Sequence, residues 1–170
     1  MKGRSAVKKM DVLFILLIAA FLVVFLVACA SPLVVGDDIK FDKISDFYYT
    51  IDASTNPPFF LRYRVYTVDG VHTFYHEERS GDHWPLTDND ATVIEKREMT
   101  EEEWDSFCKC IADGKVTKRT DSVEAGSSGP WLYLYWSGDK GTYQVFEFRD
   151  LDAQYDFRKW CEGMVATMKQ

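Results

Sequence analysis

The sequence lacks the short motifs that identify many enzymes. It has no G-x-S-x-G nucleophile elbow, no H-E-x-x-H zinc motif, no Walker A loop and no G-x-G-x-x-G after an expected strand. Cysteine is scarce, and Cys108-Lys109-Cys110 does not have the C-x-x-C spacing of zinc and redox sites. We therefore predict no catalytic residue, no bound metal and no cofactor.

Positive charge is also in short supply, with 20 Lys and Arg residues against 27 Asp and Glu residues. Residues 1–28 contain four basic residues, Lys2, Arg4, Lys8 and Lys9, and one acidic residue, Asp11. Their net charge is therefore +3, and that of the rest of the chain is −10. Phosphate backbones repel an acidic domain of this kind, which argues against nucleic-acid binding. With 46% apolar and 28% charged residues, the composition is typical of one globular domain.

Long apolar runs are confined to the front of the chain. Val12 to Val27 is an unbroken apolar run of 16 residues, which follows the basic start and precedes the small residues Ala28, Cys29 and Ala30. This order is typical of a secretory signal. As a helix, residues 12–30 would be about 28 Å long, close to the roughly 30 Å of a hydrocarbon core. Length alone therefore does not separate a cleaved signal from a membrane anchor.

The residues Leu26-Val27-Ala28-Cys29 end this run. They resemble the lipobox of bacterial lipoproteins, in which an aliphatic residue, a small or β-branched residue and a small residue precede the cysteine that carries the lipid. The resemblance implies that Cys29 is diacylglycerylated and becomes the N-terminus. Two acyl chains then hold the protein on the membrane, since each buried CH₂ contributes about 0.8 kcal/mol.

With its T-E-E-E-W and G-P-W-L-Y-L-Y-W segments, the whole chain resembles small lipoproteins of Gram-positive bacteria. This resemblance implies a lipid-anchored location on the extracytoplasmic side of the cell membrane, and no particular activity. We predict a signal peptide at residues 1–28, a lipid-anchored tether at 29–45 and one extracytoplasmic domain at 46–170.

Two other interpretations fit the same front end. Ala28-Cys29-Ala30 satisfies the A-x-A pattern of signal peptidase I, and an uncleaved run would make the chain a single-pass, signal-anchored membrane protein. The Lys and Arg bias places the rest of the chain outside the cytoplasm in the anchored form as well.

From Asp46 the sequence is typical of β-strands, with many aromatic and β-branched residues. Strands are predicted at residues 47–51, 59–68, 92–96, 131–136 and 142–149. Asp69-Gly70 predicts a two-residue type I′ turn into a further strand. That turn would pair Val65 with Phe74 and Tyr63 with His76 on the core face. The last two strands form a second hairpin whose register stays open, because four-residue and five-residue loops give opposite pairings.

Two amphipathic helices complete the pattern. Thr100 and Glu103 form a capping box, an apolar stripe follows, and Gly114 ends the first helix. The second helix begins at about Asp152. The order strands, helix, strands, helix predicts an α+β fold, with both helices packed on one face of a mainly antiparallel sheet and the hydrophobic signal or anchor helix in front.

The cysteines of the domain suggest two alternatives. Cys108 and Cys161 lie on the apolar stripes of the two helices, whereas Cys110 is about 200° away from Cys108 and is expected to point outward. In an exported domain, Cys108 and Cys161 could form a disulfide that stabilises the fold by roughly 4 kcal/mol. The alternative is that both are ordinary buried thiols.

The histidines and one acidic turn carry side chains of the kinds that bind metals or act in catalysis. His72 and His76 share a strand face but are about 13 Å apart, too far for one ion, and His83 lies beside Asp82 in a loop. Asp88-Asn89-Asp90 has calcium-like spacing but lacks the glycine and the distal Glu of an EF-hand. We interpret the histidines as packing or surface residues and the acidic turn as solvated.

The strand at 131–136 carries large apolar groups on both faces. Trp131, Tyr133 and Tyr135 alternate with two leucines and a tryptophan. Either the strand is central and covered on both faces, or one face, joined by Tyr143, is an exposed aromatic platform that binds a sugar, a peptide or a protein.

These observations favour a non-catalytic, lipid-anchored binding module whose partner is a protein, a peptide or a glycan. The alternative is an envelope hydrolase or inhibitor-like protein that acts on peptide or glycan. A deep pocket that joins a histidine to carboxylates with shifted pKa values would favour the hydrolase, and an exposed aromatic face would favour binding.

Overall fold

A computed structural model describes residues 44–119, 129–136 and 144–169 of the 170-residue chain. The chain divides into two compact units, residues 1–32 and 33–170, and only the second contains described residues. The predicted signal peptide, Cys29 and Tyr143 therefore lie outside the described residues. Within the part that is described, no helix is both long enough and apolar enough to cross a membrane.

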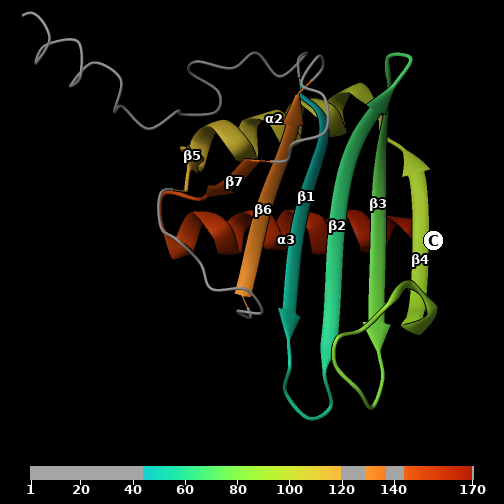
Figure 1. The fold of residues 1–170 in the computed structure, drawn as a ribbon. Coiled ribbons are helices and arrows are strands. Elements are labelled where there is room, and N and C mark those ends of the chain that lie inside the picture. Colours follow the sequence, from blue (N-terminus) through green and yellow to red (C-terminus); the bar gives the residue numbers. More distant parts are fainter. Residues whose placement is uncertain (1–43, 120–128, 137–143, 170) are drawn as a thin grey trace, which may run out of the picture. The chain divides into compact units, whose positions relative to one another are not determined.

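Seven antiparallel strands form one sheet in the order β4-β3-β2-β1-β6-β7-β5 (Figure 1). The strands are β1 (Ile44–Ala53), β2 (Phe59–Val68), β3 (Val71–Ser80), β4 (Ala91–Glu98), β5 (Thr117–Lys118), β6 (Gly129–Trp136) and β7 (Gln144–Glu147). The helices are η2 (Asp88–Asp90), α2 (Glu101–Asp113) and α3 (Leu151–Met168). Both α-helices lie on the same face of the sheet (Figure 1). The α+β prediction is confirmed, although the short strand β5 was not predicted and β1 begins within the predicted tether.

The turn between β2 and β3 has the predicted conformation. Asp69 and Gly70 have φ angles of 50° and 82°, the left-handed values that a type I′ turn requires at both central positions. Val65 pairs with Phe74, and Tyr63 pairs with His76, as predicted. The second hairpin is also resolved, because β6 and β7 pair in the register that joins Leu132 with Phe146.

Alternate residues of the strands face the helices and form the core. Phe47 of β1 is 1% exposed, and its ring lies 5.0 Å from that of Phe107 in α2 and 5.4 Å from that of Phe157 in α3. Phe74 of β3, which is fully buried, meets Trp160 of α3 edge to face at 5.9 Å. The predicted apolar stripes of both helices are therefore the surfaces that pack on the sheet.

The ends of α2 follow from two local features. At the start, Thr100 Oγ1 accepts from the Glu103 N–H at 3.3 Å, while the Glu103 carboxylate accepts from the Thr100 N–H at 2.9 Å, which is the predicted capping box. At the end, Gly114 has an ordinary helical φ of −69°. A Cβ there would lie 2.8 Å from Cδ1 of Phe148 and 3.0 Å from the Cys110 carbonyl oxygen. Gly114 is required for close packing rather than for an unusual backbone conformation.

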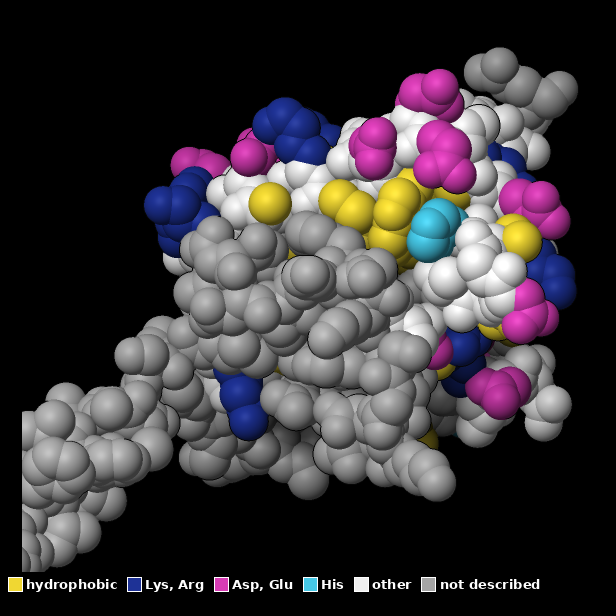
Figure 2. Space-filling view, turned by 90° about the horizontal axis from the view of Figure 1, so that it is seen from above, with side chains coloured by type: hydrophobic (Ala, Val, Ile, Leu, Met, Phe, Trp, Pro, Cys, Tyr) yellow, Lys and Arg dark blue, Asp and Glu magenta, His cyan; other side chains and the backbone are white. Residues whose placement is uncertain are grey.

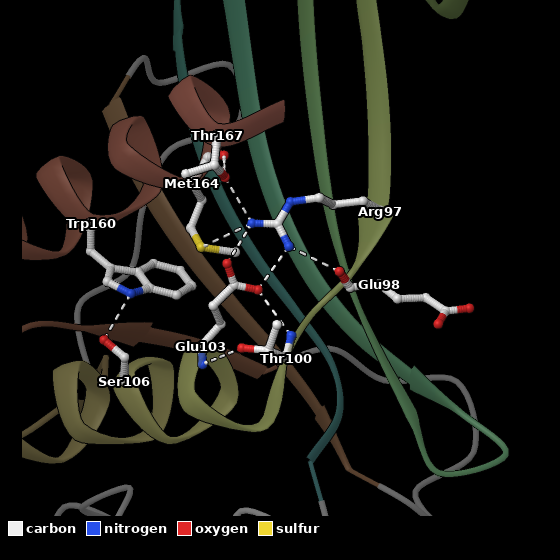
Figure 3. Close-up of polar contacts among 8 residues, drawn as sticks. All are labelled: Arg97, Glu98, Thr100, Glu103, Ser106, Trp160, Met164 and Thr167. Carbon is white, nitrogen blue, oxygen red and sulfur yellow. Dashed lines mark hydrogen bonds and ion pairs between the residues drawn. The ribbon is translucent and has the colours of Figure 1, made fainter. Parts of the chain in front are cut away.

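Arg97 of β4 joins the sheet to both helices (Figure 3). Its guanidinium donates to the two carboxylate oxygens of Glu103 in α2 at 2.7 and 2.6 Å, and to Thr167 Oγ1 in α3 at 2.8 Å. The hydrogen bonds from Arg97 hold the pKa of Glu103 below its usual range. Trp160 Nε1 donates to Ser106 Oγ at 3.0 Å and links the two helices directly. These contacts tie both helices to the end of β4, which is the end of the sheet beside α2.

The outer surface at this end is acidic. Three carboxylates lie in the first turn of α2, where the partial positive charge of the helix N-terminus favours them. Figure 2, which looks down on this end, shows Asp and Glu side chains around a small apolar patch beside a histidine. His72 of β3 stacks on Trp104 of α2 with 3.6 Å between ring centroids and 4° between ring planes. Side-chain packing therefore closes this end of the helical layer.

Candidate functional site

The two helices cover only part of the sheet. In Figure 1, α2 crosses the strands near one end and α3 crosses them near the middle. The ends of β1, β2 and β3 near Ala53, Phe59 and Ser80 extend beyond α3, and neither α2 nor α3 crosses them there. We call these strand ends the open end. On the face toward the helices, Ile51 and Leu61 are only partly buried there and Phe59 is 44% exposed.

Two cavities lie between the open end and α3. The larger has a volume of about 540 Å³, and the strands contribute Ile51, Phe59, Leu61, Tyr63, His76 and Glu78 to it. On the helix side, Arg158, Glu162 and Val165 line it. The second cavity, of about 440 Å³, shares Ile51 and Arg158 with the first and reaches Leu151 and Tyr155. We call the two cavities together the groove.

One face of α3 forms a wall of the groove. Leu151, Tyr155, Arg158, Glu162 and Val165 are spaced by four, three, four and three residues, so they lie along one side of the helix. This stripe lies beside the one that packs into the core. Its first two members are apolar yet 79% and 58% exposed. The wall is therefore amphipathic and open to solvent.

A histidine and a glutamate meet at the groove. His76 Nε2 lies 2.9 Å from Glu78 Oε1, and the imidazole stacks on the Tyr63 ring at 5.2 Å between centroids. His76 is only 1% exposed, while the Glu78 side chain is 45% exposed. His76 Nδ1 is buried without a hydrogen-bond partner among the described residues. The imidazole is packed as the sequence predicted, and very little of it is open to the cavity that it lines.

The other polar groups of the groove include a neutral phenol and an ion pair. Burial raises the pKa of Tyr63, and the negative charges around it act in the same direction, so the phenol stays protonated and can donate a hydrogen bond. Arg158 donates to Glu162 at 2.9 Å, and this hydrogen bond raises the pKa of Arg158. The groove thus combines an apolar floor with hydroxyl groups, that of Tyr63 among them, and a rim of both charge signs.

The carboxylates of the acidic turn, Asp88 and Asp90, interact with side chains and backbone of the protein itself. Asp88 pairs with Arg79 at 2.5 Å. Asp90 accepts from the Thr87 N–H at 2.6 Å and from Thr87 Oγ1 at 2.7 Å, and these hydrogen bonds hold its pKa below the usual range. His83 lies 3.5 Å from Asp90. Among the described residues, no three potential ligand side chains are grouped as a metal site would need.

Trp131 and Tyr133 lie on the sheet face opposite the helices, where they are partly buried. Arginine side chains stack on the aromatic rings of this face. The stacked pairs are Arg62 and Arg64 with Tyr48, Arg64 with Tyr66, Arg79 with Phe60, and Arg119 with Trp131, at 4.6 to 5.1 Å. We call these residues the arginine layer. A guanidinium on the ring face occupies the surface on which a sugar would stack.

The aromatic platform therefore stays a prediction for its other members. The side chain of Tyr135 and all of Tyr143 lie outside the described residues. In the described part, the arginine layer satisfies its own charges, since Arg64 donates to Asp46 at 2.8 Å and Arg62 pairs with Glu77 at 3.4 Å. This face resembles a self-contained stabilising layer more than an open sugar platform.

Cys108, Cys110 and Cys161 are free thiols in the structure, so the hypothesised bridge between Cys108 and Cys161 is not formed in it. The expectation that Cys110 points outward is wrong. Phe107 and Ile111 mark the centre of the buried face of α2, and Cys108 and Cys110 lie about 80° to either side of it, where both pack partly buried against the core. Burial raises the pKa of Cys108 to about 12. Cys161 is fully buried, and both burial and the nearby Cys110 raise its pKa.

Sequence reasoning did not predict the groove. The only local signal was that Leu151 and Tyr155 are apolar yet fall outside the core stripe of their helix. Comparisons with family models, with curated proteins and with solved structures find no match to this chain. The function proposed below therefore rests on the chemistry and geometry of the residues themselves.

Proposed function

We propose that this protein is a lipid-anchored, extracytoplasmic binding module and that its ligand occupies the groove. The anchor rests on the lipobox-like residues Leu26-Val27-Ala28-Cys29 behind a basic and apolar leader. The single observation that carries the binding site is the groove itself, a long concave surface with an apolar floor at the end of a sheet whose core is complete elsewhere. Concave, mostly apolar sites with a few polar groups are the usual form of ligand sites.

Binding is better supported than hydrolysis. The His76–Glu78 pair is the observation that favours a hydrolase, because a histidine oriented by a carboxylate is a common general base. A general base must reach the proton that it removes, however, and the His76 ring is 1% exposed. A peptidase or glycosidase activity that is lost in a folded His76→Gln variant would support the hydrolase instead.

The first experiment tests the anchor. We expect the intact mass of the N-terminal peptide from membranes of the producing cell to show a diacylglyceryl group on Cys29 and the loss of residues 1–28. A Cys29→Ser variant should be neither processed nor lipidated. A full-length, unmodified protein in the cytosol would overturn the anchor, and so would a Ser variant that is processed and membrane-bound like the wild type.

The second experiment tests the groove. A photo-crosslinking benzoylphenylalanine replaces Glu162, which lines the groove, or Asp113, which does not. Both residues are exposed carboxylates in i,i+4 ion pairs, Glu162 with Arg158 and Asp113 with Lys109. We expect irradiation of producing cells to give an adduct only from position 162. Equal adducts from both positions, or none from position 162, would contradict a ligand in the groove.

A further inference from the structure

The part of the sheet that neither α2 nor α3 crosses is about one helix wide. β1, β2 and β3 are ten residues long, which corresponds to about 33 Å at the usual rise per strand residue. Packed helices lie 8–10 Å apart, so α2 and α3 together cover about 20 Å of that length. About 10 Å remains at the open end, which is the diameter of one further helix.

The groove is also long enough for a helix. It follows α3 from Leu151 to Val165, a length of about 21 Å at 1.5 Å per residue, which a parallel helix of about 14 residues would match. Ile51 and Leu61 form its floor, and Leu151 and Tyr155 form an apolar part of its wall. A helix seated here would bury one apolar face on the sheet and a flank against α3.

An extended peptide fits the groove less well. β1, β2 and β3 each pair with a strand on both sides, so their backbone groups are already hydrogen-bonded at the open end. An extended chain lying across their side chains would find no backbone partners in the floor, and buried backbone groups without partners are costly. A helix satisfies its own backbone and needs only a surface to pack on.

The charge of the domain indicates the charge of the occupant. Glu78 and Glu162 on the rim have side chains that are 45% and 51% exposed. The arginines that line the groove are already paired, Arg158 with Glu162 and Arg79 with Glu77 and Asp88. The chain after residue 28 carries a formal charge of −10. A basic partner would be attracted to this surface, and an acidic one would be repelled.

We infer that the groove binds a basic amphipathic α-helix of about 14 residues that a partner protein presents. This inference rests on the proposed binding function and adds the chemical class of the ligand. Recognition of an amphipathic helix by an apolar groove is an established mode of peptide binding.

The test uses a labelled synthetic peptide of about 18 residues, long enough to form helix, with Leu and Lys at helical spacing. The full-length protein is held in maltoside micelles, and binding is measured by fluorescence anisotropy against empty micelles. A peptide of the same composition with strictly alternating Leu and Lys has no helical stripe and serves as the control. We expect the helical peptide to bind at least about tenfold more tightly than the alternating one.

Matched charge reversals locate the binding surface. Glu162→Lys and Asp113→Lys make the same change in charge, and each breaks an exposed i,i+4 ion pair. We expect Glu162→Lys to raise the Kd by about tenfold or more, and Asp113→Lys to raise it by less than about threefold. Equal weakening by the two variants would show general attraction to an acidic surface and would overturn the inference, as would equal binding of the two peptides.

The crosslinking experiment at position 162 separates the two proposals. An adduct from position 162 that consists of a second copy, a small molecule or another segment of this chain would overturn the helix and leave a ligand in the groove. Absence of both peptide binding and any adduct would overturn the inference and the proposed binding site together.

Discussion

The two ends of the same sheet face differ in how their apolar residues are used. Under the helices, Phe47, Val65 and Phe74 are 1%, 3% and 0% exposed. On the same strands at the open end, Ile51 and Leu61 are only partly buried and Phe59 is 44% exposed. The apolar alternation therefore continues past the layer that buries it. Because exposed apolar side chains contribute little to folding, this difference supports the proposal that a ligand binds at the open end.

The largest expected effect compares two phenylalanines on this face. Phe74→Ala should lower the free energy of unfolding by about 3–5 kcal/mol, because it removes a fully buried ring and leaves a cavity. Phe59→Ala should lower it by less than about 1 kcal/mol, because its ring is 44% exposed. Urea unfolding followed by tryptophan fluorescence measures both. Similar losses would mean that the open end is as much a part of the core as the covered end.

Alanine substitutions at two glycines compare a tightly packed position with an open one. Gly114→Ala should destabilise the protein by about 1–3 kcal/mol, because the new Cβ would meet Phe148 at 2.8 Å. Gly163→Ala should stabilise it by about 0.5–1 kcal/mol, because the new Cβ would meet nothing within 4 Å beyond the backbone of its own helix, where alanine is favoured.

A second substitution tests the cause of the Gly114 effect. Phe148→Leu should recover part of the loss when it is combined with Gly114→Ala, and thermal unfolding of the single and double variants measures the coupling. A Gly114→Ala variant as stable as the wild type would show that the end of α2 is more loosely packed than its contacts indicate.

Substitutions of two arginines compare the stability that polar contacts contribute at the covered end and at the open end. Arg97→Ala should cost about 1–2 kcal/mol, because Arg97 hydrogen-bonds to both helices and its side chain is only 26% exposed. Arg158→Ala should cost less than about 0.5 kcal/mol, because its pair with Glu162 is exposed. A double-mutant cycle with Glu103→Gln isolates the Arg97 contribution. A coupling energy near zero would make Arg97 a surface residue of no structural consequence.

Much of the fold followed from local patterns in the sequence. Asp69-Gly70 needs positive φ at both positions, and that requirement alone fixed the pairing of Tyr63 with His76. The capping box at Thr100 fixed the start of α2. The short strand β5 could not be predicted, because its two residues, Thr117 and Lys118, are held by pairing with β7 rather than by any pattern of their own.

The candidate site was less predictable than the fold because it depends on a relation between layers. The sequence shows that Ile51 lies between two polar residues and that Leu61 precedes Arg62, but it does not show where α3 crosses the strands. The error at Cys110 has a different cause, because the expectation took Cys108, rather than Phe107 and Ile111, as the centre of the buried face of α2. Cys110 packs against the core because the buried face of α2 is wide.

The smallest expected effect concerns pH and the covered end. Burial beside Trp104 lowers the pKa of His72, and Glu101 opposes this only in part. The unfolded chain therefore binds this proton more readily than the folded protein. Stability should fall as the pH drops below about 6.5, the ordinary pKa of histidine, until the folded protein is protonated as well. His72→Gln should flatten this part of the stability profile, which urea unfolding between about pH 7 and about pH 5 measures.

His83→Gln, in the exposed loop before β4, makes the same substitution away from Trp104 and is measured alongside. If His72→Gln kept the wild-type slope, the ring would have to be as well solvated in the folded protein as in the unfolded chain. The contact between β3 and α2 would then be open to water, and the contrast between a closed end and an open end of the sheet would no longer hold at this position.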